Sequence, residues 1–442
     1  MTASTRTDRS PEPERTALGR LLTLTVGAPA AGGTFVARHE GRVVFVRGAA
    51  PGETVVARLV EEPGDPSRAR FWRAETIEVL DPSPDRVPSV WPEAGTDGVG
   101  GAEWAHIGLH AQRRLATEVL QDLLRRAGVG TFALEDVQVE PAPNDHDGLG
   151  WRTRVRFAVD EEGRIGMRGW RSHAVRPVGA NPLAASAIRA LDLPSLALPA
   201  GVEAVDAVAP SAGPASLVLI GRDLDPAGIA LPPALAGADL SVQSAEGLTP
   251  IIGDGLVRER VGERRFRVGA SGFWQVHTRA AEVLSEVVRT ELDAREGDVV
   301  WDLYGGVGLF AAVLADRVGP AGAVLSVEGD RRASALAAEN LADLPQATAC
   351  TGDATAWARA QTRRPDRVVL DPPRAGAGSE LMELLALAVR ERIVYVSCEP
   401  STLARDLAIA EARGWQVEEL RAFDLFPHTH HIESVAVLGR RP

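Results

Sequence analysis

The chain has 442 residues, of which 45% are hydrophobic, and its formal net charge is -12 at pH 7. This length allows two or three domains with sizeable cores, whereas the acidic balance excludes a protein that grips nucleic acid over its whole surface. No apolar run approaches membrane-spanning length, and the two cysteines, Cys350 and Cys398, cannot form a disulfide framework. We therefore expect a cytoplasmic protein with no membrane partner, in which any nucleic-acid site is a local arginine-rich patch.

The N-terminal part combines a polar tail with short β-like runs. Residues 1–16 contain almost nothing that could be buried, which predicts a disordered tail. Residues 17–80 predict a small barrel of the oligonucleotide-binding (OB) kind, because five apolar runs are separated by glycine and proline turns. The runs are LLTLTV, TFVAR, RVVFVRG, ETVVARLV and WRAETIEVL. A β-module without a ligand is the alternative interpretation of this pattern.

A proline-rich linker, DPSPDRVPSVWP, follows the barrel and precedes a small α+β domain that we place at residues 88–262. In this domain the apolar spacing from Leu109 to Ala127 predicts a helix that ends at Gly128. Residues 177–250 are rich in alanine and proline and carry no chemical signal.

The same domain carries an arginine-rich segment, residues 151–176, with the pattern of a β-hairpin. Arg152, Arg154 and Arg156 alternate along it, so a strand would place them on one face. Such a face suits either phosphate contact or plain solvation, and acidic residues at the turn partly neutralise it.

Residues 263–442 alternate strand-like and helix-like segments, which predicts a Rossmann-like α/β domain with a doubly wound parallel sheet. The expected strands are VVWDL, AVLSVE, RVVLD, IVYVSC and SVAVL, and the expected helices are 276–293, 330–342, 378–390 and 401–413. Ligands of open α/β sheets bind where the strands end, so residues at these positions are the candidates for chemistry.

Cys398 follows one of the expected strands and precedes a helix that Pro400 can open. A helix N-terminus lowers the pKa of a thiol, because its dipole favours the thiolate. Cys398 is therefore a candidate nucleophile, and a small buried core residue is the alternative interpretation.

The stretch VVWDLYGGVGLFA (299–311) ends a strand at an aspartate and opens a helix through a glycine turn. Glycines let a ligand approach the backbone closely, and Glu328 at the end of the next strand is placed to bind ribose hydroxyls. Gly306, Gly308 and Ala311 also fit the relaxed dinucleotide fingerprint G-x-G-x-x-[GA]. The loop therefore indicates a nucleotide-type ligand without deciding which one.

A third motif, RVVLDPPRAGAG (367–378), places an acid and two prolines after a strand and so predicts a stiff, extended turn at the ligand-binding edge. The turn resembles the Asp/Asn-Pro-Pro-aromatic turn of amino-group methyltransferases, but Arg374 replaces the aromatic residue. This difference suits attack on a ring carbon, and a rigid surface loop is the alternative interpretation.

The C-terminal motif FDLFPHTHHIESVAVL (423–438) places Glu433 in an otherwise apolar strand. Burial raises the pKa of a carboxyl group, as a general base at neutral pH requires; a satisfied structural glutamate is the alternative. His428, His430 and His431 suggest a metal at first sight, but no nearby residues complete a metal-ligand set.

Together these segments resemble the TRAM-domain RNA uracil-5-methyltransferase family. The family's motifs FFQVN, a DLF/Y-C-G glycine loop, DPPRAG, SCNPxTLARDL and FPHTHHVETV stand here in the same order as FWQVH, DLYGGVGLF, DPPRAG, SCEPSTLARDL and FPHTHHIESV. The N-terminal barrel resembles the family's TRAM module, and GVGGAEW followed by a helix resembles its central domain.

The resemblance implies methyl transfer from S-adenosylmethionine to C5 of a uridine in tRNA or ribosomal RNA. Cys398 would be the nucleophile that adds to C6, and Glu433 would accept the C5 proton. The residues implied to bind the cofactor are Gln275, Tyr304, Glu328, Asp371 and, near the adenine, Asp353. No obligatory protein partner is implied.

Two differences from the family pattern bear on this expectation. Some members hold an iron–sulfur cluster through a CGGC segment, where this chain has Val99 and Ala102 at the cysteine positions, so we expect no cluster and no metal. His277 and Glu399 replace the usual asparagines, which bears on substrate choice. The alternative functions are an RNA 5-methylcytosine methyltransferase, an NAD-dependent oxidoreductase and a non-catalytic RNA-binding protein.

Overall fold

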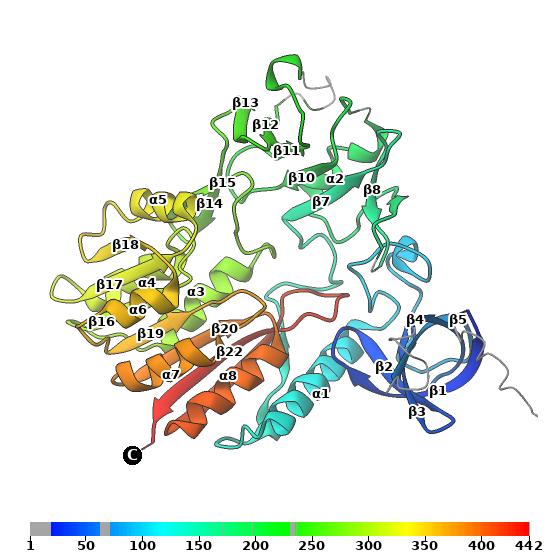
Figure 1. Cartoon of the computed structure of the whole chain (residues 1–442), viewed down its shortest axis with the longest axis horizontal. Coiled ribbons are helices and arrows are strands. Elements are labelled where there is room, and N and C mark those ends of the chain that lie inside the picture. Colours follow the sequence, from blue (N-terminus) through cyan, green and yellow to red (C-terminus); the bar gives the residue numbers. More distant parts are fainter. Residues whose placement is uncertain are drawn as a thin grey trace, which may run out of the picture. The chain divides into compact units, whose positions relative to one another are not determined.

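The computed structural model describes residues 19–61, 71–170, 172–196, 198–229, 235 and 237–441, so the predicted tail, residues 1–16, lies outside the described part. The chain forms two compact units, Met1–Arg86 and Val87–Pro442. The strands of the first unit are drawn in blue in Figure 1. Within the described residues, no helix has the length and apolarity needed to cross a membrane.

The first unit is a closed five-stranded barrel, which confirms the predicted strands. Their order around the barrel is β1-β2-β3-β5-β4. Their bounds are β1 (Leu21–Ala30), β2 (Thr34–His39), β3 (Arg42–Arg47), β4 (Thr54–Glu61) and β5 (Phe71–Asp81). Alternate residues of β1 point inward, so Leu22, Leu24 and Val26 are buried. Buried Glu53 accepts hydrogen bonds from the guanidinium of Arg86, the last residue of this unit, and so ties the end of the unit to the barrel.

The first α-helix of the second unit is α1 (Leu109–Ala127), and it ends as predicted at Gly128, whose φ is 78°. A seven-stranded sheet of order β13-β12-β11-β10-β7-β8-β9 follows. Its strands are β7 (Arg154–Val159), β8 (Ile165–Arg168), β9 (Val175–Pro177), β10 (Ala204–Val208), β11 (Ser216–Ile220), β12 (Asp239–Ser244) and β13 (Gly247–Ile252). Strands β7 and β8 confirm the hairpin predicted in residues 151–176. Residues 177–250, in which we found no chemical signal, supply much of the rest of the sheet.

The hairpin of β14 (Leu256–Val261) and β15 (Arg264–Gly269) follows this sheet in the chain and precedes the C-terminal one. The helix α2 (Ser186–Arg189) and 3-10 turns at Leu193–Ser195 and Pro226–Gly228 lie between strands of the central sheet, and 3-10 turns at Pro92–Ala94 and Leu134–Asp136 flank α1. Arg154 on β7 donates to the Gly272 carbonyl at 2.8 Å, so the central sheet holds the loop that carries Gln275.

The C-terminal sheet has eight strands in the order β18-β17-β16-β19-β20-β22-β21-β6. Their bounds are β16 (Val299–Leu303), β17 (Ala323–Glu328), β18 (Ala347–Thr351), β19 (Arg367–Leu370), β20 (Arg392–Ser397), β21 (Trp415–Asp424), β22 (Glu433–Arg440) and β6 (Val139–Pro141). The expected parallel sheet is confirmed for β16 to β20, whereas β22, which contains the expected strand SVAVL, is antiparallel to β20 and to β21. Strands β21 and β22 are joined only by residues 425–432. So short a connection requires antiparallel pairing, because parallel neighbours need a crossover.

Helices accompany this sheet as expected for a doubly wound domain (Figure 1). They are α3 (Ala280–Glu291), α4 (Leu309–Val318), α5 (Arg331–Asn340), α6 (Ala354–Ala360), α7 (Gly378–Ala388) and α8 (Pro400–Ala412). Helix α3 packs on α4, while α6, α7 and α8 pack in a row with α1 beside α8. The central strands are buried on both sides, which explains the continuous apolar runs of β19 and β20.

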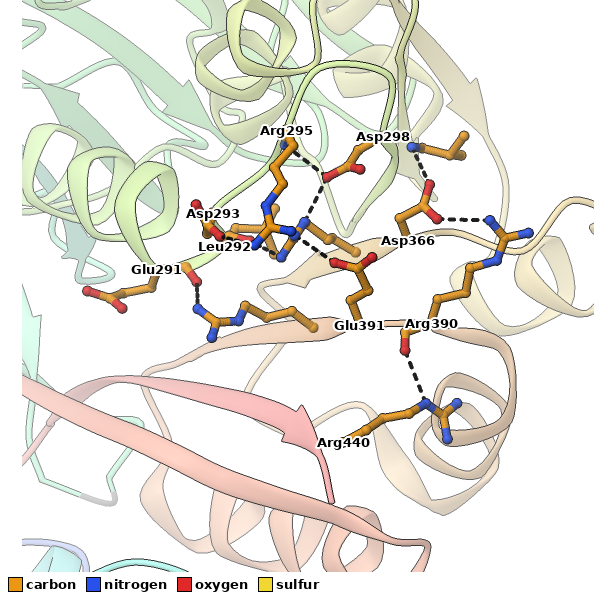
Figure 2. Close-up of polar contacts among 12 residues, drawn as sticks. Glu291, Leu292, Asp293, Arg295, Asp298, Asp366, Arg390, Glu391 and Arg440 are labelled. Carbon is orange, nitrogen blue, oxygen red and sulfur yellow. Dashed lines mark hydrogen bonds and ion pairs between the residues drawn. The ribbon is translucent and has the colours of Figure 1, made fainter. Parts of the chain in front are cut away.

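A polar network anchors the amino-terminal ends of β16, β19 and β20 (Figure 2). At its centre is Arg367, 2% exposed, which donates to Asp298 Oδ2 and to Glu391 Oε2, each at 2.7 Å, and to the Leu292 carbonyl. Asp366 in turn accepts from the Val299 N–H at 2.8 Å. These contacts fix the relative positions of the strands, whose opposite ends carry the candidate site.

Candidate active site

The candidate residues meet at one edge of the C-terminal sheet. The strands β16 to β20 are parallel, so their carboxyl ends lie together, and the antiparallel β22 begins at the same edge. The predicted site residues that end or follow these strands are Tyr304, Glu328, Asp353, Asp371 and Cys398, and Glu433 begins β22. Gln275 comes from the loop before α3 and donates from Nε2 to Asp371 Oδ2 at 3.1 Å.

Cys398 lies between the end of β20 and Pro400, the first residue of α8. Burial, together with the charges of Glu433 and Asp371, raises the pKa of its thiol to about 11. The Arg374 guanidinium opposes this shift through its charge and a hydrogen bond to the sulfur. The expectation that the helix N-terminus lowers this thiol pKa is wrong for the protein alone, because burial and two carboxyl groups outweigh the helix dipole.

Glu433 is 3% exposed, and burial and the charge of Asp371 raise its pKa well above the ordinary value, as its place in an apolar strand predicted. Burial also raises the pKa of Asp371 to about 7, against the lowering effect of the Gln275 hydrogen bond. These two carboxyl groups and the thiol disfavour one another's ionised forms. Asp371 therefore titrates close to neutral pH, while the protonated form of the Cys398 thiol is favoured in the protein alone.

The glycine loop after β16 is held by a buried aspartate. Asp302 Oδ2 accepts from the Ala311 N–H at 3.1 Å and from the Ser326 hydroxyl at 2.9 Å, which joins the start of α4 to β17. Burial raises the pKa of Asp302 to about 7. A Cβ added at Gly305 would clash with Ser326 Oγ and with the Asp302 carboxyl group, so glycine is required at this position.

The next turn of the loop leaves room for a ligand. Tyr304 has φ 62° and Gly306 has φ 56°, and the Gly306 N–H donates to Glu328 Oε2 at 3.0 Å. A Cβ added at Gly306 would meet no atom within 4 Å. Glu328 Oε1 accepts from the Asp330 N–H at 2.7 Å, yet each carboxylate oxygen can still accept a second bond. An open turn beside a carboxylate fits the nucleoside part of a cofactor.

Asp353 has a local structural use as well. It caps α6 by accepting from the Ala356 N–H at 2.9 Å. Its charge raises the pKa of Tyr304, second to burial, so the two side chains are neighbours. The place of Asp353 near an adenine stays a prediction.

The residues at the two positions that differ from the family pattern have structural contacts. His277 is buried, stacks on Trp151 with ring centroids 5.7 Å apart, and accepts from the Arg279 N–H at 3.0 Å. Glu399 caps α8 by accepting from the Ser401 hydroxyl at 2.7 Å and from the Ser401 N–H. An effect of His277 and Glu399 on substrate choice stays a prediction.

The arginines of the hairpin are largely used within the protein. Arg156 forms two hydrogen bonds to Asp206, each 2.6 Å long. Arg154 is directed at backbone carbonyls and lies 3.8 Å from Glu259. Arg152 is only partly exposed and lies near Glu103 and Arg374. These three side chains therefore do not form one free phosphate-binding face.

The histidine cluster is also used internally. His428 Nδ1 accepts from Gln112 Nε2 at 3.0 Å and its Nε2 donates to the Asp147 carbonyl at 2.9 Å. In the described part of the chain, no group of three or more His, Cys, Asp or Glu side chains is arranged to hold a metal ion. The absence of an iron–sulfur cluster stays a prediction.

Sequence reasoning missed three contributors to the site. Arg374 was noted only as a departure from another motif, although its place after Asp371 could have identified it. Asp302 could have been found from its place before the glycines. Glu103 could not, because it precedes the histidine that it binds, His430, by 327 residues.

Two family descriptions match parts of the chain. Residues 361–441 match the family described as tRNA (Uracil-5-)-methyltransferase, and residues 15–69 match the TRAM domain.

Relatives extend the match to nearly the whole chain. A protein of Streptomyces avermitilis, named an uncharacterized RNA methyltransferase, is 42% identical over 95% of this chain and 98% of its own length. A protein of the same description from Bifidobacterium longum is 35% identical over 92% of this chain and 94% of its own. The crystal structure of Pyrococcus abyssi tRNA (uracil-54, C5)-methyltransferase in complex with S-adenosyl-L-homocysteine has the same fold, with a TM-score of 0.70, 21% identity and coverage of 94% of this chain and 100% of that one.

Proposed function

We propose, from the premise that this chain belongs to the TRAM-containing RNA (uracil-5-)methyltransferase family, that it transfers a methyl group from S-adenosylmethionine to C5 of a uridine in tRNA or ribosomal RNA in the cytoplasm. The observation that carries the proposal is the placing of Cys398 and Glu433 side by side at the edge where the glycine loop also opens. Membership of an RNA methyltransferase family leaves the oxidoreductase and the non-catalytic interpretations without support.

Cys398 would begin the reaction by adding to C6 of the uracil. The new S–C6 bond moves the C5=C6 electron pair toward C5 and O4, which turns C5 into a nucleophile. Arg374 supports this step because its guanidinium favours the thiolate over the thiol. The target base must leave its stack to reach such a site, and Phe273, 70% exposed beside the Gln275 loop, offers a ring on which it can lie.

Gln275, Tyr304, Glu328, Asp353 and Asp371 would hold S-adenosylmethionine, which supplies an electrophilic methyl group on its sulfonium when bound. Glu433 would then take the proton from the methylated C5. As the C5–H electron pair re-forms the C5=C6 bond, the S–C6 bond breaks and the thiolate of Cys398 leaves. The raised pKa of Glu433 suits this role, because a weakly acidic carboxyl group is a better proton acceptor when ionised.

The test is trapping with RNA that carries 5-fluorouridine. Fluorine at C5 cannot leave as a proton, so the protein should form an RNA adduct that survives denaturation, and mass spectrometry should place it on Cys398. Nucleoside analysis of ordinary RNA should show 5-methyluridine. An adduct on Cys350, or 5-methylcytidine as the product, would contradict the proposal.

A further inference from the structure

A continuous set of side-chain contacts runs from a buried carboxylate to the thiol. Glu103 Oε2 lies 3.2 Å from His430 Nδ1, and the rings of His430 and His431 have centroids 4.2 Å apart. His431 Nε2 lies 3.1 Å from Arg374 Nη2, and the Arg374 guanidinium is near enough to the Cys398 thiol to oppose the rise in its pKa. The mechanism above uses only the last two of these five residues.

The direction of each hydrogen bond follows from its chemistry. A guanidinium can only donate, so His431 Nε2 must accept from Arg374, and the proton of that neutral ring is on Nδ1. Burial opposes ionisation of Glu103, but the hydrogen bond and charge of His430 outweigh it and lower the Glu103 pKa to about 2. Glu103 is therefore a carboxylate, and His430 Nδ1 donates to it.

Packing fixes the plane of the His431 ring. The ring lies between His430 and the ring of Phe426, whose centroid is 5.7 Å away in an edge-on arrangement. The Thr429 hydroxyl accepts from the His431 N–H at 3.2 Å and closes the turn. Burial, His430 and Arg374 lower the His431 pKa to about 3, so the ring stays a neutral acceptor throughout the physiological range. Arg152 adds to this lowering and Glu103 opposes it.

Arg374 needs such a support. It is exposed, follows two prolines, and its positive charge opposes the effect of Glu433 and Asp371 on the thiol. An exposed arginine is flexible and gains little from a single ion pair. An acceptor held in a fixed position favours the guanidinium staying beside the sulfur over its exposure to solvent, and His431 Nε2 is such an acceptor.

We propose that His431 is a positioning residue that holds Arg374 against the Cys398 sulfur, with the Glu103–His430 pair holding the His431 ring in turn. The importance of this arrangement for methyl transfer rests on the proposed function, but its effect on the thiol does not. The structure thus assigns to the histidine turn a specific task in preparing the nucleophile.

Alkylation of the full-length protein by iodoacetamide, without RNA or cofactor, measures this effect directly. The rate at Cys398 is followed by mass spectrometry between pH 7 and 9, with Cys350 in the same sample as the internal reference. His431→Phe keeps a ring in the stack and removes the acceptor. His431→Gln removes the ring and keeps an acceptor that can reach Arg374. His110→Phe, at an exposed position of α1, is the matched control.

The expected result is that His431→Phe slows Cys398 alkylation roughly tenfold, because losing one nearby positive charge raises a thiol pKa by about one unit. His431→Gln and His110→Phe should stay within about threefold of the unchanged protein, as a retained hydrogen bond requires. In Arg374→Met protein, adding His431→Phe should change nothing further, since the histidine acts through the arginine.

The opposite order, with His431→Gln slow and His431→Phe unchanged, would mean that the ring only packs, and would overturn the proposal. A further slowing of the Arg374→Met protein by His431→Phe would also overturn it. If the alkylation pattern holds while the unchanged protein fails to methylate uridine in RNA, the proposed function is wrong and the positioning role stands.

Discussion

Ser397 and Ser434 are direct partners in the antiparallel pairing of β20 with β22. Because Cys398 follows Ser397 and Glu433 precedes Ser434, this one register places the thiol and the carboxyl group opposite each other where the two strands leave the sheet. A slip of one residue would turn one of them to the other face. The pairing therefore sets the geometry on which the following predictions depend.

Replacement of Cys398 by alanine should lower methyl transfer by more than about a thousandfold, as expected when a nucleophile is removed. Affinity for S-adenosylhomocysteine, measured by calorimetry, should stay close to that of the unchanged protein, because the thiol acts on the base. Cys350→Ala is the control, and it should keep full activity since Cys350 lies on the edge strand β18. Methylation by Cys398→Ala protein would rule out the covalent mechanism.

The substitution Glu433→Gln should stop the reaction at a later step than the loss of the Cys398 thiol does. Glutamine has the same shape but cannot take a proton, so addition and methylation should proceed and proton loss should stall. A covalent protein–RNA adduct should then accumulate with ordinary uridine RNA and be visible on denaturing gels. Glu246→Gln, at an exposed site, should leave no adduct. Normal turnover by the Glu433→Gln protein would show that another group accepts the proton.

Glu328→Ala should weaken cofactor binding by about 1–3 kcal/mol, the scale of hydrogen bonds lost from a buried partner. The change also frees the Gly306 and Asp330 N–H groups, so the loop should lose some order. Titration with S-adenosylhomocysteine checks this, with Glu339→Ala on the exposed side of α5 as the control. Equal affinities in both variants would remove Glu328 from the cofactor site.

Asp302→Asn should change the pH dependence of stability. The folded pKa of Asp302 is about 7 against an ordinary value of 3.8, because the carboxyl group is buried. Its contribution to stability is therefore fully present below pH 3.8 and is lost as the pH rises through 7. Asparagine does not titrate, so the variant should gain roughly 1–4 kcal/mol on the unchanged protein between pH 4 and pH 8. Urea unfolding across this range measures the difference, and parallel pH profiles would show that Asp302 does not titrate as argued.

Removal of the barrel, residues 1–86, should raise the KM for RNA more than it lowers kcat. The remaining residues form a compact unit of their own and contain every predicted catalytic and cofactor residue. RNA affinity of the full chain should fall as salt rises, as phosphate contacts require, and less steeply after truncation. Unchanged cofactor affinity is the control for folding, and an unchanged KM would assign the barrel another task.

Local patterns were enough to predict much of the fold. The five strands of the barrel, the helix that ends at Gly128 and the alternation of β16 to α8 follow from apolar spacing and glycine punctuation, which act over a few residues. The edge strand β18 and the C-terminal strand β21 were not anticipated, because partly exposed strands show a weak apolar pattern.

The candidate site divides in the same way. Sequence by itself determined which residues follow strands and carry chemistry, such as Cys398, because in an α/β fold a strand's end is where ligands bind. Only the tertiary structure decided how those groups affect one another. The raised pKa of the thiol, and the reach of Glu103 through His430 to the active site, depend on burial and on contacts between segments hundreds of residues apart. Charges and burial affect a pKa through space, so these pKa shifts cannot be predicted from the order of residues along the chain.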